Sequence, residues 1–266
     1  MERAPEVVRS RSNPLVRRFR AVKAGGGKAE GLALLEGVKL LEEAAAAGLE
    51  IVEAAATPRA MVRARRAIDA AVAAGTAIRI VEESVLASLS DAETSQGVVA
   101  LALRPAFDEE RIFRGVPLVV VAVGLQNPGN LGGLLRTAEG AGATGAFVTV
   151  GSADPFSWKA LRGSMGSAFR LPHVSGLTAQ AVLGRLRKRG VRSVATVSGA
   201  GTSYGAADFR KPVAFLFGNE GAGLPGDVVR EADLRVAIPM RGAVESLNVG
   251  VAAGVLLFEA ARQRGR

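Results

Sequence analysis

The stretch Gly124-Leu-Gln-Asn-Pro-Gly-Asn-Leu-Gly-Gly-Leu-Leu-Arg-Thr-Ala138 decides the fold of this chain. It follows an apolar run, 118–123, and continues into a pattern typical of a helix. A strand that ends in a turn of Gly, Asn and Pro and then becomes a helix is where α/β proteins bind ligands. The turn also carries Asn130 and Arg136, two polar residues that a simple connection does not require.

Strands and helices alternate on both sides of this turn. The pattern predicts helices at 38–47, 61–74, 83–88, 131–142, 157–165, 178–189 and 246–262, and strands at 51–56, 78–81, 96–103, 118–123, 145–150, 191–197, 212–217 and 234–238. Such alternation indicates an α/β protein, and in its C-terminal part a parallel sheet with helices on both faces.

Composition divides the 266 residues into four parts. Residues 1–28 hold eight basic and two acidic residues, which indicates a basic arm that contacts phosphates or is simply solvated. We expect a small domain at 29–103, a linker with two prolines at 104–117, and a second domain at 118–266.

The charge and the missing residue types narrow the function. A net charge of +9 favours a polyanionic partner, nucleic acid before membrane. With no cysteine and one histidine, disulfides, thiol catalysis and metal sites built on Cys or His are excluded, no metal site is expected, and His173 is expected to be a structural or surface residue. No apolar run is long enough to span a bilayer, so we expect a cytosolic protein.

Two further Gly-rich polar segments follow predicted strands, Phe217–Gly223 and Pro239–Asn248. The carboxyl ends of parallel strands share one edge of a sheet, so all three loops are expected to form one site. The first loop matches neither a dinucleotide-binding nor a P-loop pattern. The remaining interpretation is that its glycines allow the backbone to close around a flat ligand.

Each polar residue of these loops also has a structural interpretation. Asn130 could cap the helix at 131–142, and Arg136 could lie on its surface. Glu220 could cap a helix near 225–230, and Ser246 could cap the last helix, with Asn248 in its first turn. The last helix is apolar on nearly all sides and should be buried. Its Gly250 and Gly254 permit close packing, in a dimer or within one subunit.

Taken together, the three segments resemble the motifs of the SpoU (TrmH-like) family of RNA ribose 2'-O-methyltransferases, of the SPOUT class. The first motif spans Asn127 to Ala138. The second is matched by Phe217, Gly218, Glu220, Gly223 and Leu224, and the third by Ile238, Pro239, Met240, Gly242, Ser246, Leu247, Asn248 and Ala252. Asn13-Pro14, Leu35-Glu-Gly37 and Ser95-Gln-Gly-Val98 are similar to the family's substrate-binding domain, which resembles ribosomal protein L30e.

The resemblance implies an α/β fold with a deep trefoil knot in the C-terminal domain, preceded by a small L30e-like domain. It further implies a homodimer that binds S-adenosylmethionine and methylates RNA, ribosomal RNA before transfer RNA. The residues it implies for the cofactor are Phe217, Gly218, Asn219, Gly221, Ile238, Met240, Leu247 and Asn248, and those for catalysis are Asn130, Arg136, Glu220, Ser246 and Asn248. Base methylation by a SPOUT enzyme, or RNA binding without catalysis, are the alternatives.

The family proposal makes Arg136 the base that removes the ribose 2'-hydroxyl proton. A guanidinium has a pKa of about 12 or higher and gives up its proton reluctantly. We therefore expect Arg136 to hold a phosphate or the ribose oxygen, with the proton passing to phosphate or water. Asn130 and Ser246 would orient the ribose, and Glu220 would fix Arg136 or Asn130.

Overall fold

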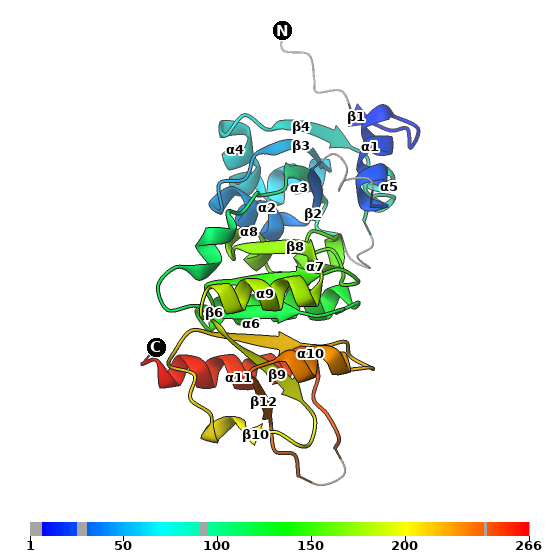
Figure 1. The fold of residues 1–266 in the computed structure, drawn as a ribbon. Helices are drawn as coiled ribbons and strands as arrows, with labels where there is room; N and C mark the ends of the chain where they lie inside the picture. Colours follow the sequence, from blue (N-terminus) through cyan, green and yellow to red (C-terminus); the bar gives the residue numbers. More distant parts are fainter. Residues whose placement is uncertain (1–6, 26–30, 91–94, 242–243, 266) are drawn as a thin grey trace. The chain divides into compact units, whose positions relative to one another are not determined.

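The computed structural model describes residues 7–25, 31–90, 95–241 and 244–265. The chain forms two compact units (Figure 1). Unit 1 contains residues 1–105 together with 156–169, and unit 2 contains 106–155 and 170–266. The segment 156–169, expected within the second domain, therefore packs with the first unit.

Unit 1 is built on a five-stranded mixed sheet with the order β1-β4-β3-β5-β2. The strands are β1 (Val7–Val8), β2 (Leu32–Glu36), β3 (Ile51–Ala56), β4 (Ala77–Val81) and β5 (Val98–Leu103). β5 runs antiparallel to both β2 and β3, with Leu34 opposite Leu101. The core strands are almost wholly apolar because helices cover both faces of the sheet.

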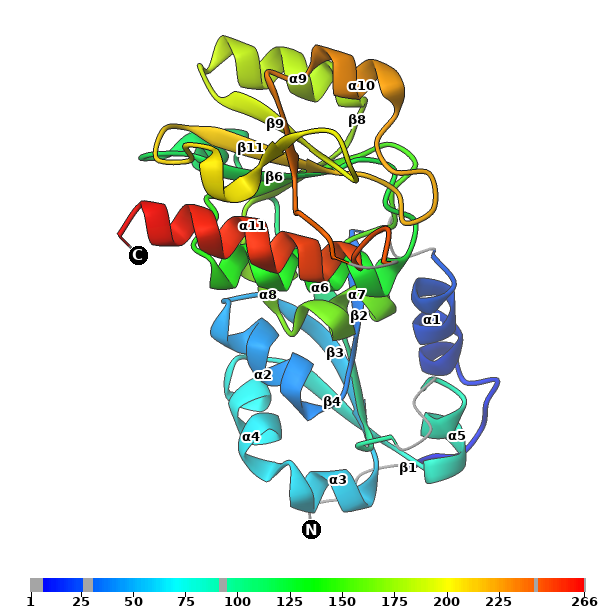
Figure 2. The same cartoon turned by 90° about the horizontal axis from the view of Figure 1, so that it is seen from below.

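The helices of unit 1 form two layers (Figure 2). They are α1 (Pro14–Lys23), α2 (Val38–Ala46), α3 (Pro58–Arg63), α4 (Arg65–Ala73), α5 (Glu83–Ala87), α7 (Trp158–Ser164) and α8 (Ser167–Arg170). α1 and α5 lie on one face, and α2 and α4 on the other. α7 packs against β2.

Part of the segment expected to be a basic arm is folded. α1 begins where Asn13 accepts a hydrogen bond from the Leu15 N–H at 2.9 Å, with a proline in its first turn. Val16, Phe19 and Val22 are buried in the core of unit 1. The arginines between them point to solvent, so α1 is an amphipathic helix with a basic outer face.

The motif residues of unit 1 build a tight corner. The Gln96 side chain accepts from the Val38 N–H at 2.8 Å, at the start of α2, and a Cβ on Gly37 would lie 2.8 Å from that same oxygen. A Cβ on Gly97, which has a φ of +80°, would lie 2.7 Å from the Thr57 hydroxyl. Both glycines also have a positive φ, so backbone conformation and packing together account for them.

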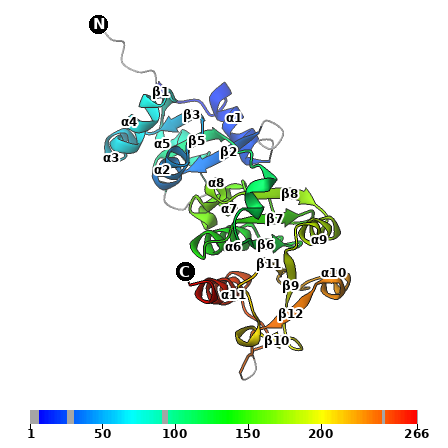
Figure 3. The ribbon, with the colours of Figure 1, turned by 60° about the vertical axis from the view of Figure 1, so that its left-hand side comes forward.

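Unit 2 contains a seven-stranded sheet whose neighbouring strands run parallel, in the order β10-β12-β9-β11-β6-β7-β8 (Figure 3). The strands are β6 (Leu118–Ala122), β7 (Gly145–Thr149), β8 (His173–Leu177), β9 (Arg192–Val197), β10 (Thr202–Ser203), β11 (Val213–Phe217) and β12 (Leu234–Ala237). β6 and β11 are buried throughout and lie side by side in the middle of the sheet.

Helices cover both faces of this sheet, as the sequence predicts (Figure 2). They are α6 (Pro128–Gly140), α9 (Ala179–Lys188), α10 (Gly226–Glu231) and α11 (Val249–Gln263), with short 3-10 helices η2 (Glu109–Phe113) and η3 (Tyr204–Ala206). α9 and α10 pack on one face, where Leu186 and Val228 join the core, and α6 and α11 pair on the other. The predicted linker is partly folded, since Ile112 of η2 is buried in this core.

The last helix is less buried than its composition predicts. Val251 and Phe258 of α11 are 53% and 54% exposed. Gly254 faces α6 within the same unit, because a Cβ there would lie 4.0 Å from the Thr137 methyl group. Within one chain α11 is therefore only partly buried, and the apolar face that carries Val251 and Phe258 is exposed.

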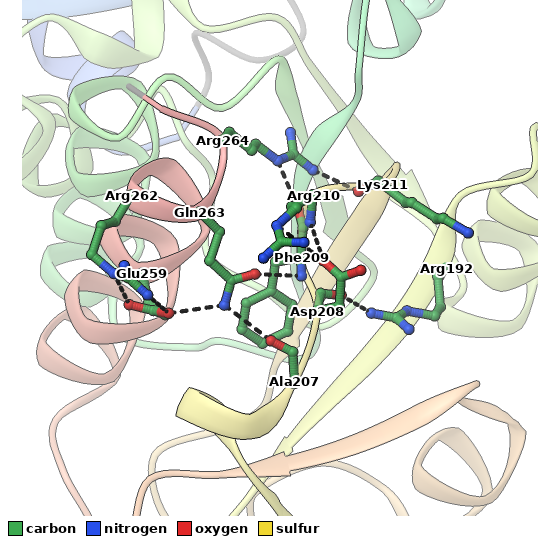
Figure 4. Close-up of polar contacts among 10 residues, drawn as sticks. All are labelled: Arg192, Ala207, Asp208, Phe209, Arg210, Lys211, Glu259, Arg262, Gln263 and Arg264. Atoms are coloured by element: carbon green, nitrogen blue, oxygen red, sulfur yellow. Dashed lines mark hydrogen bonds and ion pairs between the residues drawn. The ribbon is translucent and has the colours of Figure 1, made fainter.

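Side chains at the end of α11 hold this helix against two loops (Figure 4). We call this cluster the C-terminal clasp, and it consists of Glu259, Arg262, Gln263 and Arg264. Arg264 donates to four backbone carbonyls, those of Val116, Pro117, Phe209 and Lys211, over 2.8–3.0 Å. Gln263 accepts from the Phe209 N–H and donates to the Ala207 carbonyl. Hydrogen bonds from Arg262 and Gln263 lower the pKa of Glu259 to about 2.

His173 is structural, as expected. Its ring is 6% exposed, contacts the ring of Phe107 at 4.9 Å, and lies with Nδ1 3.0 Å from the Leu171 carbonyl. Burial lowers the pKa of His173. In the described parts of the chain, no helix is long and apolar enough to cross a membrane.

Candidate active site

The three loops meet at the carboxyl edge of the parallel sheet of unit 2, as predicted. They line a cavity of about 520 Å³, within the range of small-molecule sites. All eight residues expected to hold the cofactor line it, namely Phe217, Gly218, Asn219, Gly221, Ile238, Met240, Leu247 and Asn248. Four of the five expected catalytic residues line it as well, namely Asn130, Glu220, Ser246 and Asn248.

The first loop leaves the side chain of Asn130 free for the site. Asn127 caps α6, since its Oδ1 accepts from the N–H groups of Gly129 and Asn130 at 2.8 and 3.2 Å. Pro128 follows as the first helical residue, a position where its missing N–H costs nothing. The helix therefore begins three residues earlier than predicted, and the interpretation of Asn130 as its cap is wrong.

The second loop is a tight turn that only glycine permits. An ideal Cβ on Gly218 would lie 2.2 Å from the backbone carbon of Gly223. Across the turn, Asn219 and Gly223 exchange two backbone hydrogen bonds, at 3.1 and 2.9 Å. Glu220 lies at the tip, exposed at the cavity. α10 begins after Pro225 and has no side-chain cap, so Glu220 does not cap it.

The third loop leads into α11. Asn248 caps this helix by accepting from the Gly250 N–H at 2.9 Å, so the prediction of Ser246 as the cap is wrong. Ser246 is exposed and lines the cavity. Gly242, part of the third motif, lies outside the described residues.

One hydrogen-bonded chain joins the three loops. Asn130 Nδ2 donates to Glu220 at 2.9 Å, and Asn130 Oδ1 accepts from Asn248 Nδ2 at 3.1 Å. A carboxylate only accepts, which forces the nitrogen of the Asn130 amide toward Glu220 and its oxygen toward Asn248. These residues are separated by 90 and 118 positions in the sequence, so only the fold brings them together.

Arg136 lies apart from this network. It is an exposed residue of α6 and is absent from the residues that line the cavity. Of the two partners that we expected for Glu220, the structure places Asn130 against it. Asn130 and Arg136 are six residues apart on α6, a spacing that puts them on different faces of a helix.

Sequence reasoning missed part of the cavity wall. Thr196, Val197 and Ser198 line it from the end of β9, and Ala252 and Leu256 from α11. The residues at the end of β9 could have been predicted, because the carboxyl end of this strand must lie at the same edge of the sheet as those of its parallel neighbours. Glu245, two residues before the expected Leu247, also lines the cavity.

Comparisons with known proteins agree with these motifs. Residues 117–258 match the SpoU rRNA Methylase family, and residues 13–100 match the MRM3-like substrate binding domain. An uncharacterised tRNA/rRNA methyltransferase of Synechocystis is 36% identical over 97% of this chain and 94% of its own length. The 23S rRNA (guanosine-2'-O-)-methyltransferase RlmB of Ralstonia nicotianae is 35% identical over 74% of this chain and 81% of its own length.

Solved structures give the same result for the fold. A crystal structure of an AdoMet-bound rRNA methyltransferase from Sinorhizobium meliloti superposes with a TM-score of 0.83, at 32% identity, over 97% of each chain. The predicted α/β fold with a parallel sheet is confirmed. From the motifs, the parallel sheet and these matches, we conclude that the chain belongs to the SpoU rRNA methylase family.

Proposed function

We propose that this protein transfers a methyl group from S-adenosylmethionine to a ribose 2'-hydroxyl of RNA, with ribosomal RNA favoured over transfer RNA. The observation that carries the proposal is the chain Glu220–Asn130–Asn248, which joins all three motif loops at the mouth of one cavity. Family membership and a ribose 2'-O-methyltransferase relative support it.

The cavity suits a cationic cofactor. Among the described residues that line it, Glu220 and Glu245 are carboxylates, and neither lysine nor arginine contributes. A sulfonium carries a positive charge, so nearby carboxylates favour its binding. Besides polar side chains, the walls hold apolar side chains such as Phe217, Ile238 and Leu247 and the backbone of Gly-rich turns, which suit a flat base. When bound, S-adenosylmethionine supplies an electrophilic methyl group.

The protein contributes positioning more than proton chemistry. The amide of Asn130 is hydrogen-bonded at both its nitrogen and its oxygen. Its remaining N–H and lone pair therefore point in fixed directions and can orient a ribose. Ser246 offers a hydroxyl at the same cavity. Because Arg136 is exposed and off the cavity, we assign it to an RNA phosphate, and the 2'-hydroxyl proton to phosphate or water.

We propose that unit 1 presents the RNA. Its match to a substrate-binding domain supports this role, as does the basic outer face of α1, where Arg17 and Arg20 are exposed. We assign substrate binding to unit 1, within an L30e-like fold, and catalysis to unit 2. Deleting residues 1–28 would remove residues of α1 that are buried in the core of unit 1, so we choose the double variant Arg17→Ala with Arg20→Ala as the test. This variant should reduce the slope of the logarithm of the RNA-binding constant against the logarithm of the salt concentration.

We further propose a trefoil knot and a homodimer for unit 2. The path of the last helix supports a knot. The chain enters α11 after β12, which lies near one end of the sheet, yet α11 packs against α6, the helix that follows β6, and β9 and β11 lie between β12 and β6 in the sheet. In support of a dimer, the exposed Val251 and Phe258 lie on one apolar face of α11.

The test is transfer of a labelled methyl group to total RNA, followed by nuclease digestion and mass spectrometry of the labelled nucleotide. We expect a ribose 2'-O-methyl group. Asn130→Asp places a carboxylate beside Glu220 and should abolish transfer while S-adenosylmethionine still binds. Arg136→Lys should lose most activity, because an ammonium lacks the planar fork. A methyl group on the base would refute the proposal, as would RNA that stays unlabelled by a wild-type protein that binds the cofactor.

A further inference from the structure

The side chain of Asn219 is already engaged within the protein. Its Oδ1 accepts from the N–H groups of Gly221 and Ala222 at 2.9 and 3.2 Å, inside the second loop. Its Nδ2 donates to the carbonyl of Gly124 at 3.1 Å, at the start of the first loop. Two N–H donors on one side and a carbonyl on the other force this orientation of the amide.

Gly124 is held by hydrogen bonds at both its N–H and its carbonyl. Its N–H donates to the Thr149 hydroxyl at 3.1 Å, while its carbonyl accepts from Asn219. Its φ of +62° lies in the left-handed region, which glycine adopts without strain. The turn from β6 to α6 therefore starts at a point fixed by Thr149 from β7 and by Asn219 from the loop after β11.

Two side-chain bonds thus join the first and second loops, and they differ in exposure. Asn130 to Glu220 lies at the exposed surface, where water competes for both partners. Asn219 to Gly124 is partly buried, so its donor and acceptor would lose more if they were separated. The partly buried bond is therefore the one that can set the spacing of the two loops.

We infer that Asn219 is a positioning residue, which holds the start of the first loop against the cofactor loop and so keeps Asn130 in register with Glu220. Three of the four hydrogen bonds that its amide can make are already formed within the protein, so the main role that we assign to this side chain is to hold the two loops together. This role rests on the proposed methyl transfer, because its consequence is the alignment of the ribose with the cofactor.

The test is Asn219→Asp, which keeps an oxygen for the two N–H groups of the loop and removes the donor to Gly124. We expect kcat for methyl transfer to fall about tenfold, the effect of one hydrogen bond, with the Kd for S-adenosylmethionine changed less than about threefold. Backbone N–H groups of residues 124–130 should exchange with deuterium about tenfold faster for the same reason. Asn219→Ala also removes the loop bonds and should weaken cofactor binding.

Asn127→Asp is the matched control. Asn127 accepts the same pair of hydrogen bonds, from the second and third following N–H groups, and within the described part of the chain its amide nitrogen makes no bond to another loop. A carboxylate is also a good helix cap, so kcat, Kd and exchange should stay at wild-type values. Thr149→Val removes the other bond to Gly124, and its effect on kcat should be non-additive with Asn219→Asp because both act on one turn.

The outcomes separate the inference from the proposed function. The inference is overturned if Asn219→Asp behaves like Asn127→Asp in kcat and exchange. It is equally overturned if kcat is kept and the Kd alone rises, since Asn219 would then be a direct cofactor contact. Failure of the wild-type protein to methylate RNA would refute the function instead, and exchange at 124–130 would still report whether Asn219 positions the turn.

Discussion

Replacing Arg264 with alanine should loosen the C-terminal clasp and destabilise unit 2. The guanidinium spreads its donors over four carbonyls on two segments, at Val116 and Pro117 and at Phe209 and Lys211. The bonds to Phe209 and Pro117 are partly buried, and the other two are exposed. Counting about 1.5 kcal/mol for each partly buried bond from a charged donor, and little for the exposed ones, gives a loss of about 3 kcal/mol.

This loss should be visible in thermal unfolding. A change of about 3 kcal/mol lowers the Tm by about 6–12 °C in a unit of this size. Trp158 is the single tryptophan and belongs to unit 1, so its fluorescence follows unit 1 while circular dichroism follows both units. Comparing the two signals assigns the shifted transition.

Arg262→Ala is the matched control for this prediction. Arg262 is 73% exposed and pairs with Glu259 in the neighbouring turn, so its loss should leave the Tm close to that of the wild type. Arg264→Lys should fall between the two, because one ammonium cannot reach carbonyls on two segments. If Arg264→Ala melted like Arg262→Ala, the clasp would not hold the helix and the reasoning would be refuted.

Three further predictions concern other parts of unit 2. Gly218→Ala should abolish measurable cofactor binding in calorimetry, because the new Cβ would lie 2.2 Å from backbone. Gly184→Ala, which has open space around the new Cβ, should bind the cofactor as the wild type does. Equal affinities of the two variants would contradict this prediction. The pKa of Glu259 is lowered from its ordinary value of 4.5 to about 2, so its ionised form stabilises the folded state at pH values above 4.5. This contribution is lost as the pH falls from 4.5 toward 2. Melting curves of Glu259→Gln should therefore lack that acid-dependent loss, and a slope equal to that of the wild type would count against it. Phe258→Arg should convert the proposed dimer to a monomer in sedimentation, while Val62→Arg, on an exposed site of α3, should not; a dimeric Phe258→Arg would exclude this face.

Local patterns predicted the elements that are buried and strongly periodic. The runs of β6 and β11 are apolar throughout, and the structure places them in the centre of the sheet. The convergence of the three loops also followed from the sequence, because parallel strands end at one edge. The motif spacing alone identifies Asn130, Glu220 and Asn248, which the structure joins by hydrogen bonds.

The elements that were missed depend on tertiary context. β8 has two exposed residues, one of which is a glycine, and it is a strand because it pairs with β7 at the edge of the sheet. α1 was hidden by its arginines, although Val16 and Phe19 have the spacing of a buried helical face. The helix starts differ from those expected because several residues in these loops are able to cap, and Asn127 before Pro128 and Asn248 are the ones that do so.

The hydrogen-bonded chain at the cavity also constrains when activity can arise during synthesis. Asn130 emerges from the ribosome 118 residues before Asn248, its partner at the head of α11. β6, α6 and β7 are available early, yet the contacts that define the cavity are among the most non-local in the chain, and such contacts form late. A nascent chain that has folded its first unit therefore stays inactive until α11 has been made and docked beside α6.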